Sequence, residues 1–200
     1  MFLGTELTNV LEAIENDKDY TSAQNKMMKI SGNVIPDFQQ DNTDRNRTSP
    51  FAFTGNKFEF RAVGSAQSIA GPNIVLNVAV AEVLDEFVEK VSNAKDKKAA
   101  IHKVIKDAVA AHKRIVFNGD GYTDAWLKEA KKRGLLNLKS TPEALPYWLT
   151  KKNLDLFSKH NIYTEKESRS RIEIHFDEYC KTINIEAKAM MEMLTKDLLP

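Results

Sequence analysis

The chain has 200 residues, 28% of them charged, and a formal net charge of +1, so its charge indicates no bias towards nucleic acid or an anionic membrane. Its hydrophobic content of 42% is enough for a globular core, and its length suits one domain or slightly more. A single cysteine excludes an intrachain disulfide and predicts a reducing, cytoplasmic location. No apolar run approaches the roughly 20 residues of a membrane-spanning helix, and no signal peptide is recognised.

The first element is predicted to be a helix. Its aliphatic residues recur at helical spacing: Leu7, Val10, Leu11 and Ile14. Thr5 is expected to cap its start. Residues 26–35 are apolar enough for either a short strand or a short helix, and the pattern does not decide between them. Residues 36–50 are mostly polar and predict a long loop, which in a compact domain is usually functional or disordered.

A strand, broken by Gly55-Asn56, is predicted over residues 53–63. Its second half alternates charged and aromatic residues: Lys57, Phe58, Glu59, Phe60 and Arg61. Successive side chains of a strand point to opposite faces, so we expect the three charged side chains on one face and the two phenylalanines buried on the other. A carboxylate between two cations suits a site for a metal and anionic groups. A solvated strand face with weak ion pairs is the alternative that alternation alone leaves open.

Helices are predicted for most of the remaining chain. Residues 64–71 are small and polar but lack the spacing of a P-loop or a dinucleotide-binding loop. Pro72 suits the first turn of a helix, and this helix is apolar on much of its circumference, so we expect it to be largely buried. A second helix covers residues 101–109. His102 and His112 lie too far apart in sequence to bind one metal from adjacent turns.

The C-terminal half carries clear helix boundaries. Residues 118–121 have turn chemistry, and Thr123 is expected to cap the short helix that follows. A further helix starts near Ser140. Thr164 and Glu167 form a capping box before a helix over residues 165–198, which would be roughly 50 Å long and whose apolar stripe must be covered by another helix. The predicted fold class is therefore α+β and predominantly helical, with one long helix near the C-terminus.

Three stretches closely resemble the class III glutamine synthetases: RNRTSPFAFTGNKFEFR at 45–61, IVFNGDGYTDAWLKEAKKRGLLNLKSTPEALPYW at 115–148 and FDEYCKTINIEAKAM at 176–190. Residues 46–49 look like the Asn-Arg-Ser-Ala segment of the wider superfamily, and residues 57–61 look like its Arg-Ile-Glu-x-Arg strand. The resemblance implies that residues 1–72 end a catalytic domain and that residues 73–200 form the following helical region. It also implies an internal piece of an enzyme several times longer.

The resemblance implies an ATP-dependent ligase that joins ammonia to glutamate through a glutamyl-phosphate, with Mg²⁺ or Mn²⁺ bound beside ATP. By this resemblance, Glu59 is a metal ligand and Arg61 binds the substrate glutamate. Arg47 and Lys57 contact the phosphates of ATP, and Arg45 is a further candidate for that role. The resemblance also implies a homo-oligomer of stacked hexameric rings. The near-neutral charge and the lack of a long apolar run predict no nucleic-acid or membrane partner.

Departures from the family pattern affect these roles. The spacing from Arg47 to Glu59 is shorter than in the best-known classes, and two positions carry a different residue. The best-known classes place a second arginine five residues after the Arg47 equivalent, where this chain has Ala52. Lys57 replaces an arginine, which keeps the charge but loses the planar fork. The chain alone is expected to be inactive, since it holds too few metal carboxylates. A non-catalytic helical interaction module derived from the same family is the alternative function.

Overall fold

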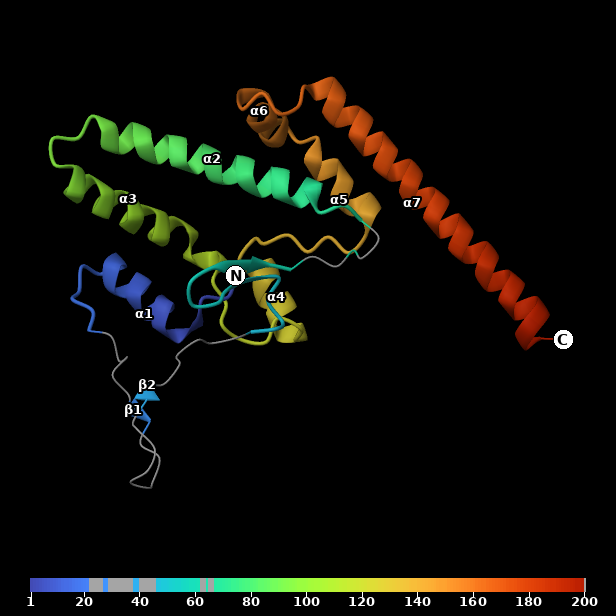
Figure 1. Cartoon of the computed structure of the whole chain (residues 1–200), viewed down its shortest axis with the longest axis horizontal. Coiled ribbons are helices and arrows are strands. Elements are labelled where there is room, and N and C mark those ends of the chain that lie inside the picture. The colour runs from blue at the N-terminus through green and yellow to red at the C-terminus, as the bar shows by residue number, and fades with distance from the viewer. Residues whose placement is uncertain (22–26, 29–37, 40–45, 62–63, 65–66, 200) are drawn as a thin grey trace. The chain divides into compact units, whose positions relative to one another are not determined.

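Helices make up most of the chain and the strands are short, as the sequence predicts (Figure 1). The structure is a computed structural model that describes residues 1–21, 27–28, 38–39, 46–61, 64 and 67–199. It divides into two compact units. The first unit contains Met1–Ile69 and Val83–Leu136, and the second contains Ala70–Glu82 and Asn137–Pro200.

In the first unit, helix α1 (Gly4–Glu15) lies beside helix α3 (Lys97–His112) (Figure 1). Thr5 does not cap α1, contrary to the prediction, because it already lies inside the first turn. Instead, Oδ1 of Asn118 accepts hydrogen bonds from the backbone N–H groups of Leu3, at 3.1 Å, and Gly4, at 3.2 Å. A distant side chain thus satisfies helix-start donors that would otherwise have no partner.

Two strand pairs belong to the same unit. The first pairs β1 (Met27–Met28) with β2 (Phe38–Gln39) in antiparallel fashion. Strand β1 lies in the segment for which the sequence left strand and helix open, and β2 lies in the predicted long loop. Residues 29–37 and residues 40–45 lie outside the described part of the chain.

The second pair is a hairpin of β3 (Phe51–Phe53) and β4 (Phe58–Phe60). Gly55 in its turn adopts a φ of 87°, the left-handed region that glycine enters without steric cost. On the other side of β3, the backbone of Phe2 forms a parallel bridge to Ala52. The hairpin is therefore extended by the start of the chain, with Phe2 N–H donating to Phe51 O at 2.9 Å.

The helix boundaries of α3 and α4 follow local capping rules. Asp96 caps α3 by accepting from the N–H of Ala99 at 3.0 Å. After the short 3₁₀ turn η1 (Lys113–Ile115), helix α4 spans Asp124–Lys132. Thr123 caps it by accepting from the N–H of Trp126 at 3.3 Å, which confirms the predicted cap.

Helix α2 (Ala70–Ser92) carries Pro72 in its first turn, as predicted, but its predicted burial is wrong. Val78 is 5% exposed, whereas four other aliphatic residues are largely exposed: Val80, Val83, Leu84 and Val88. The sequence shows how much of the helix is apolar, but tertiary packing decides how much is covered, and the described part of the chain covers little of α2.

The second unit contains α5 (Thr141–Trp148), α6 (Lys151–Lys159) and α7 (Glu165–Met193), followed by the π-helical turn η2 (Leu194–Leu198). The predicted capping box of Thr164 and Glu167 is confirmed. Phe157 of α6 and Ile172 of α7 are each 3% exposed, and the two helices contact each other. Every side chain from 180 to 199 is exposed, so only the first half of α7 is packed within this unit.

Among the residues that the structure describes, no helix combines the length and the apolar character needed to cross a membrane.

Candidate functional site

The charged side chains around β4 contact one another. The Nη2 atom of Arg61 lies 3.0 Å from Oε2 of Glu59, and Nζ of Lys57 lies 3.8 Å from its Oε1. These contacts agree with the expectation that the three side chains share one face of the strand. The carboxylate is about one-third exposed and the Arg61 side chain is 27% exposed, so the pair lies partly out of solvent.

The expected burial of the two phenylalanines is wrong. Phe58 is 49% exposed and Phe60 is 45% exposed. Their rings pack against the rings of β3 on the same face of the hairpin: Phe58 lies 5.4 Å from Phe51 and 5.1 Å from Phe53 between ring centroids. These rings contact one another, and within the described part of the chain no second layer of the fold covers them.

The surroundings of Ala52 suit a small side chain at this position, where the best-known classes have a second arginine. Ala52 pairs with Glu59 in the hairpin register and with Phe2 on its other side, and it is 0% exposed. An arginine side chain at this position would have to displace the strand residues that pack around it. The small side chain therefore suits the central position of this three-stranded arrangement.

Residues 46–49, here called the Arg47 loop, lie next to the guanidinium of Arg61. Its Nη1 atom donates to the carbonyl oxygen of Asn46 and, at 3.4 Å, to that of Ser49. Arg47 stands between these two carbonyls and its side chain is exposed. The structure thus brings the backbone at Arg47 to the Glu59–Arg61 pair, while Arg45 lies outside the described residues.

On its other side, the Arg47 loop contacts residues 118–121, here called the docking turn. The Nδ2 atom of Asn46 donates to Gly119 O at 2.8 Å. The hydroxyl of Thr48 accepts from the N–H of Gly121 at 2.7 Å and donates to Oδ1 of Asn46 at 2.7 Å. The sequence identified both segments separately, but no local signal could link residues 73 positions apart.

The chemistry of these donors suits anions and one hard cation. Two cations, Lys57 and Arg61, contact the carboxylate of Glu59, and the backbone next to Arg47 accepts a hydrogen bond from Arg61. Mg²⁺ usually takes one or two protein carboxylates and completes its shell with phosphate oxygens and water. Glu59 therefore fits as one ligand of a metal shared with a phosphorylated substrate, and not as a complete metal site.

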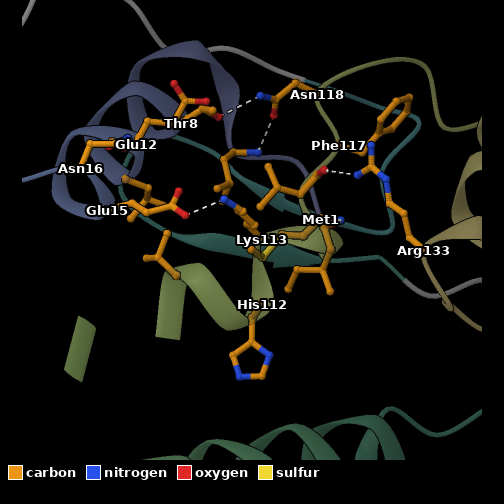
Figure 2. A pocket seen from close by; sticks show the side chains of 15 residues that line it. Met1, Thr8, Glu12, Glu15, Asn16, His112, Lys113, Phe117, Asn118 and Arg133 are labelled. Atoms are coloured by element: carbon orange, nitrogen blue, oxygen red, sulfur yellow. Dashed lines mark hydrogen bonds and ion pairs between the residues drawn. The ribbon is translucent and has the colours of Figure 1, made fainter. Parts of the chain in front are cut away.

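A separate cavity of about 670 Å³ opens between α1, the end of α3 and residues 115–118 (Figure 2). Figure 2 shows Lys113 directed at Glu15, and their ionic groups lie 2.5 Å apart. The amino group of Met1 donates to Ile115 O at 2.7 Å, and burial together with the nearby charge of Arg133 lowers the pKa of this amino group. Of the sequence-predicted site residues that the structure describes, none lines this cavity.

In the second unit, Glu82 joins α2 to α6. Its carboxylate lies 2.7 Å from both Nζ of Lys159 and Nε2 of His160. Hydrogen bonds from Lys159 and then from His160 lower the pKa of the Glu82 carboxyl. These contacts form an ion-pair link between helices and involve none of the residues near β4.

Comparison with known proteins relates the chain to one family. Residues 100–200 match the family model described as the glutamine synthetase C-terminal domain. The chain is 46% identical over 203 residues to the type-3 glutamine synthetase of Dictyostelium discoideum and 44% identical over 202 residues to the glutamine synthetase of Butyrivibrio fibrisolvens. The glutamine synthetase of Bacteroides fragilis is 35% identical over 207 residues. These alignments cover 99–100% of this chain but only 28% of each relative.

Proposed function

The chain belongs to the glutamine synthetase family, and we propose that it forms part of a longer ATP-dependent enzyme that joins ammonia to glutamate. The Glu59–Arg61 pair beside the Arg47 loop carries this proposal, because a carboxylate can bind a metal and a guanidinium can bind phosphate or carboxylate groups. The names of the three relatives, each a glutamine synthetase, support it.

In this proposal, the side-chain carboxylate of glutamate attacks the terminal phosphate of ATP, ADP leaves, and ammonia then displaces phosphate from the acyl-phosphate. Glu59 supplies one oxygen ligand to Mg²⁺ or Mn²⁺, which offsets the phosphate charge when bound. Arg47 and Lys57 contact the phosphates, and Arg45 is a further candidate.

Arg61 binds a carboxylate of the substrate glutamate. Its guanidinium already holds the Glu59 carboxylate at 3.0 Å, so it is oriented for a planar, charge-assisted contact. Substrate glutamate then either displaces the Glu59 carboxylate from Arg61 or binds to Arg61 beside it. Such an arrangement keeps the cation in place before the substrate arrives, which reduces the cost of ordering it on binding.

The division of the chain into the end of a catalytic domain at 1–72 and a helical region at 73–200 stays a prediction. So do the cytoplasmic location and the assembly into stacked hexameric rings. We propose further that the 200-residue chain makes no glutamine by itself, because Glu59 alone cannot hold the metals that phosphoryl transfer requires.

Substitution of Arg61 by lysine in the complete subunit tests the proposal. We expect the KM for glutamate to rise by about tenfold or more, since lysine keeps the charge but cannot form two parallel hydrogen bonds. The KM for ATP should change less. Arg169→Lys is the matched control, because Arg169 pairs with Glu165 on the exposed surface of α7. An effect on ATP alone would assign Arg61 to the phosphates instead.

A further inference from the structure

We infer that the docking turn, residues 118–121, positions the Arg47 loop for ATP, so that the C-terminal domain acts on the ATP site without touching the reacting groups. The inference rests on the proposed function and deepens it. Thr48 and Gly121 are the positioning residues, and neither is assigned a contact with substrate.

The first support is that the loop is held from both sides. On one side, Arg61 donates to the carbonyl oxygens of Asn46 and Ser49. On the other, the hydroxyl of Thr48 accepts from Gly121 N–H at 2.7 Å. Arg47 therefore lies in a short segment whose neighbours on either side are fixed by hydrogen bonds to two different parts of the unit.

The second support is steric. A Cβ atom added at Gly121 would lie 2.6 Å from the carbonyl oxygen of Thr48. That distance is far inside ordinary van der Waals contact, and the atom met is backbone, which cannot rotate away as a side chain could. The close approach of the two segments thus depends on glycine at this position.

The third support is that the docking turn is itself anchored. Asn118 accepts from the N–H groups of Leu3 and Gly4 and donates to the hydroxyl of Thr8 at 2.8 Å. Directly before the turn, the N–H of Phe117 donates to Met1 O at 2.9 Å. The turn is therefore also held by contacts to α1 and to the start of the chain, in addition to its contacts with the Arg47 loop.

In this arrangement, the C-terminal domain holds the Arg47 loop in position. The family match covers residues 100–200 and so includes the docking turn, whereas the Arg47 loop and the hairpin lie before it. The contacts between Asn46, Thr48 and the docking turn join these two parts of the chain. A displaced turn would move the Arg47 side chain relative to the Glu59–Arg61 pair.

The test uses four variants of the complete subunit, each assayed for glutamine formation while ATP and glutamate are varied separately. Thr48→Val removes the hydroxyl at nearly constant volume, and Gly121→Ala forces the segments apart. We expect each to raise the KM for ATP by about tenfold, the loss typical of one weakened charge-assisted contact, and to change the KM for glutamate less. Thr48→Ser keeps the hydroxyl and should restore most of the ATP affinity.

Gly71→Ala is the matched control, because a Cβ at Gly71 would meet no atom within 4 Å. Its KM for ATP should stay within about twofold of wild type. If Thr48→Val and Gly121→Ala lower kcat and the melting temperature but leave the KM for ATP unchanged, the contacts are only structural and the inference is wrong.

Amide exchange separates failure of this inference from failure of the proposed function. A wild-type subunit without ligase activity would refute the proposed function. In the same protein, the Gly121 amide should exchange slowly and lose its protection in Thr48→Val but not in Thr48→Ser. Rapid exchange of this amide in the wild type would show that the loop is not docked, and would overturn the inference whatever the activity.

Discussion

Replacement of Asn118 by alanine should loosen the start of α1 from more than 110 residues away in sequence. The side chain provides the acceptor for Leu3 and Gly4 N–H and a donor to Thr8. Loss of a helix N-cap costs about 0.5–2 kcal/mol, and one further hydrogen bond about 0.5–1.5 kcal/mol. Because two of the contacts are partly buried and the one to Thr8 is exposed, we expect a total near 2 kcal/mol rather than the sum of the upper values.

Hydrogen exchange followed by mass spectrometry measures this loss directly. A free energy of about 2 kcal/mol corresponds to roughly 30-fold faster exchange in a peptide that covers α1. Asn118→Asp keeps the acceptor and should lose less than half of the protection. Asn184→Ala, at an exposed position of α7, should leave α1 unchanged. Less than about threefold acceleration in Asn118→Ala would refute the assignment of Asn118 as the cap of α1.

Two further predictions concern the second unit. Ile172→Ala should lower the free energy of unfolding by about 3 kcal/mol in a urea titration, because Ile172 is 3% exposed, whereas Ile185→Ala, at a position 66% exposed, should cost little. The pKa of Glu82 lies below its ordinary value of 4.5, since Lys159 and His160 hold its charged form. Because the pKa of Glu82 is lower in the folded than in the unfolded chain, the ion pairs stabilise the fold above pH 4.5, and this stabilisation is lost as pH falls through the folded pKa. An NMR titration of the Glu82 carboxyl with a midpoint at or above 4.5 would contradict this.

Local signals in the sequence predicted the fold well where both partners of an interaction are close in sequence. Thr123 and the Thr164–Glu167 box cap their helices as predicted, because the N–H groups that they satisfy lie within three residues. The same reasoning failed for Thr5, since the group that caps α1 is the distant Asn118. Capping rules identify residues that can cap a helix, but they do not predict when a side chain distant in sequence takes this role.

Alternation likewise predicted part of the hairpin. It correctly indicated that Glu59 and Arg61 share a face, because period two follows from strand geometry alone. It did not show which face would be covered, and Phe58 and Phe60 are exposed while Ala52 is buried. The docking of Thr48 on Gly121 was beyond any local pattern, because it depends on how two distant segments meet.

The metal requirement of Glu59→Gln tests the central claim most directly. In the complete subunit, this change keeps the side-chain volume and removes one negative ligand. We predict that glutamine formation falls at least about 100-fold at ordinary Mg²⁺ and recovers in part as Mg²⁺ is raised. The control is Glu129→Gln, which removes another carboxylate paired with an arginine, at 2.7 Å from Arg133 in the same unit. Wild-type turnover and an unchanged Mg²⁺ dependence in Glu59→Gln would contradict the assignment of β4 to the metal and ATP site.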